Sequence, residues 1–227
     1  MATGALKAIL WDNDGVLSDT ERLFFEANRR VLAPHGIDLA HADYVAWYLE
    51  DARGAWHLLR ARGYGEDDIA QVRRARDACY AGLLAEAATP LGFPGVPAML
   101  ARLAPRVAMS IVTASFAEHV ALAHRDGGVL EHIGAVFARA PGMRPKPHPD
   151  AYLHALQQLG LDAADCIAVE DSPRGLAAAR AAGLRCIALR SELLAGYDFD
   201  GAWRVVDGHA ELERELALLL DGAAPPP

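Results

Sequence analysis

Short apolar runs recur along the chain, and most are separated by segments in which apolar residues have helical spacing. The runs cover residues 6–11, 107–112, 135–138, 166–169, 186–189 and 203–206. Continuous apolar runs of this length are typical of strands buried on both faces, and their alternation with helices is typical of a parallel sheet. We therefore expect an α/β fold in which helices cover both faces of a parallel β-sheet.

The interval from residue 21 to about residue 90 interrupts this alternation. It contains no convincing strand, and its apolar residues recur at helical spacing, first at Leu23, Phe24, Ala27 and Val31 and later at Ile69, Val72, Cys79 and Leu83. It ends near a Pro- and Gly-rich stretch at 90–95, which is typical of a linker. We therefore expect an all-helical cap domain at residues 21–90, inserted into a core formed by residues 1–20 and 91–227.

Composition and charge narrow the kind of protein. A chain of 227 residues that is 52% hydrophobic can bury a sizeable core, while a net charge of −8 disfavours binding to nucleic acid or to an anionic membrane. The first residues lack the apolar stretch of a signal peptide, and no apolar run approaches the roughly 18 residues of a membrane-spanning helix. We therefore expect a cytoplasmic protein. The three cysteines have no CxxC spacing and are interpreted as buried thiols.

Polar residues that suit catalysis follow the apolar runs. Asp12 and Asp14 follow the first run, Thr113 and Ser115 the second, Lys146 lies beyond the third, and Glu170 and Asp171 follow the fourth. Ligands of open parallel sheets gather outside the carboxyl ends of the strands, so we expect these side chains to converge. Each signal also has an ordinary alternative, since Asp, Asn and Gly are usual in turns and an acidic pair before Ser172 and Pro173 suits the start of a helix.

A shared electrostatic requirement favours the functional interpretation. Carboxylates placed close together resist ionisation unless a cation neutralises them, and a divalent metal such as Mg²⁺ is the simplest neutraliser. With Mg²⁺ and the ammonium of Lys146, such a pocket would accept a phosphate dianion, and the hydroxyl of Thr113 would hold one of its remaining oxygens. A carboxylate shielded in this way can attack phosphorus and form an aspartyl-phosphate that water later opens.

The order of these residues resembles the haloacid dehalogenase superfamily of phosphotransferases. The segment 10–21, Leu-Trp-Asp-Asn-Asp-Gly-Val-Leu-Ser-Asp-Thr-Glu, resembles the first motif of that family, residues 111–115 the second and residues 145–150 the third. Residues 169–179 are similar to the fourth motif of the branch that includes β-phosphoglucomutase and phosphoglycolate phosphatase. The resemblance spans nearly the whole chain. It implies a Rossmann-like core, a mobile cap and Mg²⁺-dependent phosphoryl transfer.

The resemblance also implies which side chains hold the metal and perform the chemistry. Asp12 would be the nucleophile, and Asp14 the general acid and base that also offers its backbone carbonyl to Mg²⁺. Asp12 and Asp171 would supply side-chain oxygens to the ion, and Glu170 would lie beside the ion or one layer outside it.

Substrate contacts are implied in the same way. Thr113 and Lys146 would bind the phosphoryl group, and Lys146 would also hold the Asp12 carboxylate in place. Ser115 is a further expected substrate contact in the core, and Arg53 is the expected contact from the cap.

Two residues help to choose among activities. Asp14 disfavours a dehalogenase, because a departing halide needs no proton, and a module that only binds phosphate would not need this acid. β-Phosphoglucomutases resemble one another in placing a His where this chain has Phe24. We therefore expect hydrolysis of a small phosphate monoester, with a phosphosugar mutase and a non-catalytic phosphate-sensing module as the alternatives. The expected partner is a small phosphorylated metabolite, and the expected state is a monomer or a weak homodimer.

Overall fold

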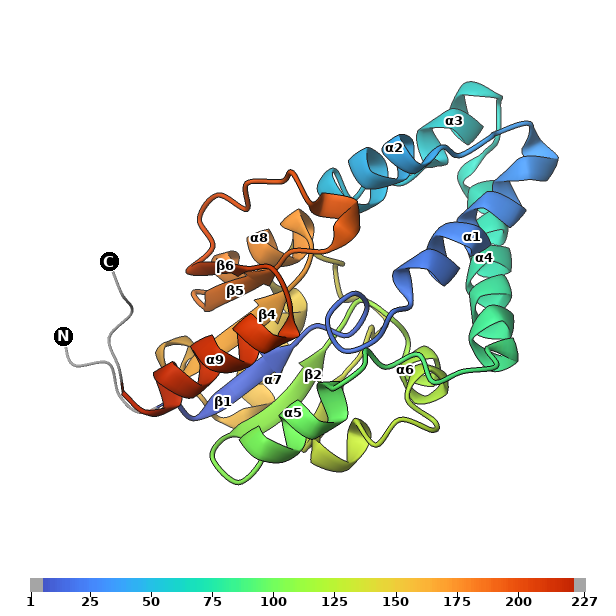
Figure 1. Cartoon of the computed structure of the whole chain (residues 1–227). Helices are drawn as coiled ribbons and strands as arrows, with labels where there is room; N and C mark the ends of the chain where they lie inside the picture. Colours follow the sequence, from blue (N-terminus) through green and yellow to red (C-terminus); the bar gives the residue numbers. More distant parts are fainter. Residues whose placement is uncertain (1–5, 223–227) are drawn as a thin grey trace.

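The computed structural model describes residues 6–222, so the outermost residues of the expected core, 1–5 and 223–227, lie outside it. Its centre is a six-stranded sheet in the order β3-β2-β1-β4-β5-β6, in which all neighbouring strands are parallel (Figure 1). The strands are β1 (Ala8–Trp11), β2 (Ala108–Val112), β3 (Ala135–Phe137), β4 (Cys166–Glu170), β5 (Arg185–Leu189) and β6 (Arg204–Val206). The predicted α/β class with a Rossmann-like parallel sheet is confirmed.

The two faces of the sheet are covered by different helices. Alternate side chains of a strand point to opposite faces, so Ile9 and Trp11 pack with α5 (Val96–Leu103) and α9 (His209–Leu220). On the other face, Ala8 and Leu10 pack with α7 (Asp150–Leu159) and α8 (Pro173–Ala181). Burial on both faces is why these strands are continuous apolar runs in the sequence.

Helices alone fill the interval after β1. They are α1 (Glu21–Leu32), a 3-10 turn (Ala33–His35), α2 (His41–Tyr44), a π-helical turn (Val45–Glu50), α3 (Trp56–Ala61) and α4 (Glu66–Glu86). Within the described part of the chain, no strand lies between β1 and β2. Figure 1 shows α1 and α4 side by side and α2 and α3 at the far end, all displaced from the sheet. We refer to residues 21–86 as the helical segment.

The buried face of α4 differs in part from the expected one. The periodicity predicted Ile69, Val72, Cys79 and Leu83, whereas the structure buries Ile69, Val72, Arg76, Tyr80 and Leu84. The predicted helical spacing was right, but the buried face is rotated and includes two polar side chains, Arg76 and Tyr80, which an apolar pattern does not detect. Both of these side chains reach the site described below.

The loop between β1 and α1 folds back on itself. The carbonyl oxygen of Asn13 accepts hydrogen bonds from the amides of Val16, Leu17 and Ser18 at 3.3, 2.9 and 3.0 Å. The amide of Asp19 then donates to the carbonyl of Leu91 at 2.7 Å, which places the two connections to the helical segment next to each other. Between the first and last described residues, no helix is long and apolar enough to cross a membrane.

The α-helix α6 (Ala117–Ala123) follows β2 and packs against α4. It therefore joins the sheet to the helical segment on the side where the carboxyl ends of the strands lie. Short 3-10 turns lie at Leu130–His132, Ala163–Asp165 and Glu192–Leu194.

Candidate active site

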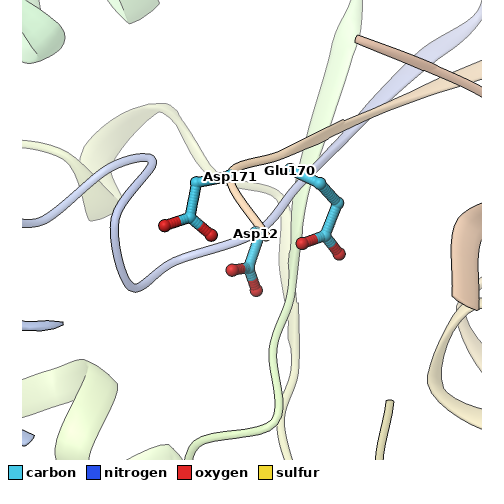
Figure 2. Close-up of side chains that lie close together, drawn as sticks. All are labelled: Asp12, Glu170 and Asp171. Atoms are coloured by element: carbon cyan, nitrogen blue, oxygen red, sulfur yellow. The ribbon is translucent and has the colours of Figure 1, made fainter. Parts of the chain in front are cut away.

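Three buried carboxylates meet where β1 and β4 end. Asp12, Glu170 and Asp171 each have an oxygen within 4.8 Å of the others, and Figure 2 shows the three side chains lying close together. Strand pairing produces this arrangement, because Trp11 lies opposite Val169 and the amide of Asp12 donates to the Val169 carbonyl at 2.9 Å. The polar residues that follow these neighbouring strands are therefore brought together, as predicted.

Two glycines give these carboxylates the space that they occupy. A Cβ atom on Gly15, which has a φ of +81°, would lie 1.9 Å from an Asp171 oxygen. A Cβ atom on Gly175 would lie 1.8 Å from Oε2 of Glu170. Any larger residue at either position would displace a carboxylate of the cluster.

Lys146 supplies the positive charge of the cluster. Its Nζ donates to Oδ1 of Asp12 at 2.7 Å, to Oε1 of Glu170 at 2.6 Å and to the carbonyl of Val112 at 2.9 Å. Burial would lower the pKa of this lysine, but the two carboxylates outweigh burial and raise the pKa above its ordinary value. Lys146 is therefore charged and holds Asp12 in place.

One lysine does not neutralise three acids. Burial is the largest cause of three raised pKa values. The pKa of Asp12 lies above its ordinary value, that of Asp171 lies well above it, and that of Glu170 is about 7. Oε2 of Glu170 is also buried without a hydrogen-bond partner. A cluster of hard oxygen donors that lacks positive charge fits a divalent cation.

Asp14 lies beside this cluster and is surrounded by hydroxyl groups. Oδ1 accepts from Thr20 at 2.6 Å and from Tyr80 at 2.9 Å, while Oδ2 accepts from Ser115 at 2.7 Å and from Thr113 at 3.4 Å. Burial raises the pKa of Asp14, but the hydrogen bonds outweigh burial and leave the pKa below its ordinary value. The hydroxyls expected to contact substrate, those of Thr113 and Ser115, are thus both directed at Asp14.

A cavity of about 220 Å³ opens over these residues, between the sheet and the helical segment. Its walls include a set of arginines from both parts, namely Arg53, Arg73, Arg76, Arg139 and Arg174. Within the described residues, the guanidinium groups of Arg73, Arg139 and Arg174 form no hydrogen bond or ion pair with the protein. Arg73 lies 5.0 Å from the centre of the Trp56 ring, and Arg139 lies 4.9 Å from that of Phe116. Arg53, Arg73 and Arg139 are exposed to solvent, so the site is acidic at its base and basic at its entrance.

Arg53, the predicted substrate contact, lines the cavity, and its side chain also binds other residues of the helical segment. It forms an ion pair with Asp51 at 3.0 Å and lies 5.7 Å from the Trp47 ring. The other residues predicted for the site, Asp12, Asp14, Thr113, Ser115, Lys146, Glu170 and Asp171, lie together at the base of the cavity or directly behind it.

Several residues of the site were not predicted from the sequence. Tyr80 and Arg73 are on α4, and their signal was the helical spacing that they share with Ile69. Thr20 belongs to the first motif but carried no separate signal. Arg174 directly follows Pro173 at the start of α8. The residues around it predicted a capped helix start, and no pattern indicated that Arg174 lines the cavity.

A family model described as haloacid dehalogenase-like hydrolase matches residues 6–183, and the chain belongs to this family. The predicted enzyme class is therefore confirmed. The chain is 36% identical over 217 residues to protein CbbY of Rhodobacter capsulatus, a match that covers 89% of this chain and 93% of that protein.

Solved structures agree with this assignment. A variant of CbbY from Rhodobacter sphaeroides in complex with xylulose-(1,5)bisphosphate has a TM-score of 0.77 at 27% identity, covering 91% of this chain and 96% of that one. A β-phosphoglucomutase of Clostridium difficile has a TM-score of 0.78, covering 96% and 98%, but at 19% identity it shows the shared fold alone.

Proposed function

We propose that this hydrolase is a Mg²⁺-dependent phosphatase that cleaves a small phosphate monoester through an aspartyl-phosphate. The observation that carries the proposal is the position of Asp12, which is bound by Lys146, lies within the carboxylate cluster and borders the cavity. Side-chain oxygens of Asp12 and Asp171 would hold Mg²⁺, with the backbone carbonyl of Asp14, and Glu170 would lie beside the ion or just outside it. Bound there, Mg²⁺ would offset the charge of the carboxylates and of the phosphoryl group.

In the first step, a carboxylate oxygen of Asp12 attacks phosphorus while the bond between phosphorus and the ester oxygen breaks. Because the four hydroxyl donors favour the Asp14 carboxylate, Asp14 first takes up the proton of the substrate's phosphoryl monoanion, and it then passes that proton to the departing oxygen. In the second step, Asp14, now a carboxylate, takes a proton from the water that attacks phosphorus, and the bond to Asp12 breaks to release inorganic phosphate. Lys146 holds Asp12 and stabilises the phosphoryl oxygens throughout.

The cavity entrance supports a substrate with a second anionic group. Burial and then the neighbouring charge of Arg76 lower the pKa of Arg73, and Arg139 also contributes to this lowering, so like charges gather there. Guanidinium groups that have no protein acceptor suit phosphate, with which they form paired charge-assisted hydrogen bonds. Since the related CbbY binds a sugar bisphosphate, we propose a bisphosphate of a small sugar as the substrate class, with Arg73 and Arg139 on the distal phosphate.

The chemical proposal is tested by phosphate release from 4-nitrophenyl phosphate with Mg²⁺ or EDTA. Asp12→Asn should abolish the release, because the amide cannot form the acyl-phosphate. Asp19→Asn is the matched control, since Asp19 lies in the same loop but is exposed and paired with Arg22 at 3.3 Å. Full activity of the Asp12 variant would refute the assigned nucleophile.

The substrate class is tested by comparing a pentulose bisphosphate with the corresponding monophosphate. Arg73→Gln and Arg139→Gln should each raise KM for the bisphosphate by about tenfold and change KM for the monophosphate little, since each removes a charge-assisted hydrogen bond to the distal group. Arg74→Gln is the control, because Arg74 is exposed on the same helix. Equal effects on both substrates would argue against a distal phosphate site.

The mutase alternative is decided by phosphorus NMR of a hexose 1-phosphate incubated with the enzyme. In this structure Phe24 packs against Tyr80, with ring centres 5.2 Å apart, and it offers no base to a second sugar. We therefore expect inorganic phosphate as the product. Accumulation of hexose 6-phosphate with little free phosphate would favour the mutase.

A further inference from the structure

Asn13 is a polar side chain buried between the two acids of the first motif. It is only 1% exposed, and its Oδ1 lies 2.6 Å from Nε2 of His124, which is 4% exposed and comes just after α6. The two residues are far apart in the sequence, so their contact is a product of the fold. Burying an amide and an imidazole together has a free-energy cost unless their hydrogen bonds are satisfied. Nδ1 of His124 has no partner among the described residues, whereas the hydrogen bonds of the Asn13 amide lead on to further side chains.

The contacts continue from Asn13 through two hydroxyl groups. Nδ2 of Asn13 donates to Oγ of Ser18 at 3.3 Å, Ser18 Oγ lies 3.2 Å from Thr20 Oγ1, and Thr20 donates to Oδ1 of Asp14 at 2.6 Å. Ser18 and Thr20 are fully buried. The described residues thus include an uninterrupted line of hydrogen bonds from His124 to the proposed general acid and base.

The donors along this line all point the same way. Thr20 must donate to Asp14, because a carboxylate only accepts, so Thr20 is free to accept from Ser18. The other acceptor near Ser18, the Asn13 carbonyl at 3.3 Å, already receives three backbone amides. With its amide nitrogen turned to Ser18, Asn13 presents an oxygen to the histidine, so Nε2 of His124 carries a proton. Burial lowers the pKa of His124 to about 4, which agrees with a neutral ring.

We propose that His124, Asn13 and Ser18 are positioning residues that fix the orientation of the Asp14 carboxylate through Thr20. Hydrogen bonds in a chain strengthen one another, so an oriented donor at one end holds the acceptor at the other. This inference rests on the proposed role of Asp14 as general acid and base. It gives a reason for the polar residue at position 13 and for a histidine with no place in the cavity.

The test uses the full chain with Mg²⁺ and two substrates, phenyl phosphate and 4-nitrophenyl phosphate. Misplacing the acid should matter more for phenyl phosphate, because its leaving oxygen is more basic. His124→Leu and Ser18→Ala should each lower kcat for phenyl phosphate about tenfold more than for 4-nitrophenyl phosphate, the effect of one lost hydrogen bond, with KM unchanged. His124→Gln should recover most of this loss, since its amide can replace the Nε2 donor.

His209→Leu is the matched control. Nε2 of His209 contacts the carbonyl of Val16 at 2.7 Å in the same loop but lies outside the line of hydrogen bonds, so this variant should not distinguish the two substrates. Asp14→Asn, measured alongside, should distinguish them most strongly. If Asp14→Asn does not, the acid role in the proposed function fails. If Asp14→Asn does distinguish the substrates but His124→Leu and Ser18→Ala slow both substrates equally, the positioning role is refuted. Failure of His124→Gln to recover the loss would refute it as well. If His124→Leu does not fold, the result for Ser18→Ala decides.

Discussion

Replacing Lys146 by Met should destabilise the metal-free protein severely. Lys146 is 4% exposed, and its loss leaves Asp12 and Glu170 as neighbouring buried carboxylates and the Val112 carbonyl without a donor. Removing one partner of a buried ion pair costs roughly 3–5 kcal/mol, because the other charge stays buried and unpaired. Met has a similar length, so little of this loss would come from a cavity.

The assay is urea unfolding in EDTA at pH 8, followed by circular dichroism. The chain has two lysines, and the other, Lys7, is the control, because it is 58% exposed in its ion pair with Asp165. Lys7→Met should leave the unfolding midpoint unchanged, as is usual for a surface pair. The cost of Lys146→Met should be smaller at pH 5, because Glu170, with a pKa of about 7, then takes up a proton in the native state.

Unfolding of the two lysine variants at the same urea concentration would refute a stabilising role of the buried Lys146 charge. If Lys146→Met lowered the free energy of unfolding as much at pH 5 as at pH 8, burial of unpaired charge would not be the cause of the destabilisation. Restoration of the midpoint by Lys146→Arg would support the electrostatic explanation, since that variant keeps the charge.

Three further outcomes are expected. Burial raises the pKa of Glu170 and of Glu21 from 4.5 to about 7 in the native state, so the metal-free protein should lose stability as the pH rises through this range, and Mg²⁺ should raise Tm more at pH 7.5 than at pH 5. A stability that increases over this range would contradict the direction of both shifts. Gly15→Ala should weaken Mg²⁺ binding by about tenfold or more in calorimetry by displacing Asp171, whereas Gly63→Ala, with a similar φ of +88° and open space around it, should only lower Tm. Equal Mg²⁺ affinities would show that Asp171 is not held by this close approach. Tyr80→Phe should lower kcat about fivefold or more with little change in KM, because it removes one hydrogen bond to Asp14 and keeps the ring packing, while Tyr48→Phe removes a hydroxyl from the same cavity without touching Asp14. A change in KM alone would assign Tyr80 to substrate binding.

The sheet and the base of the site could be predicted from the sequence for the same reason. Parallel strands buried on both faces appear as continuous apolar runs, and the residues directly after them must meet at one edge. The positions of Asp12, Thr113 and Asp171 could be predicted from the strand ends alone, because each residue directly follows a strand.

The upper wall of the cavity could not be predicted in this way. Spacing shows which residues of α4 share a face, but the angle at which that face meets the core depends on packing between distant segments. Tyr80 and Arg76 are polar, so an apolar pattern left them out of the buried face that they complete. The contact between Asn13 and His124 could not be predicted for a related reason. Neither residue forms a recognisable motif within its own segment, and only the fold brings the two side chains together.

The bond from Tyr80 to Asp14 also has a consequence for protein engineering. Exchanging the helical insert between homologous enzymes is an obvious way to transplant substrate preference, since most of the arginines over the cavity travel with it. Here the same helical segment carries the Tyr80 hydroxyl, which donates to Asp14, the proposed general acid and base, so a chimera lacking that phenol should gain a new preference together with a lower kcat. Donor inserts should therefore be chosen for a hydrogen-bond donor at this helical position as well as for the shape of their pocket.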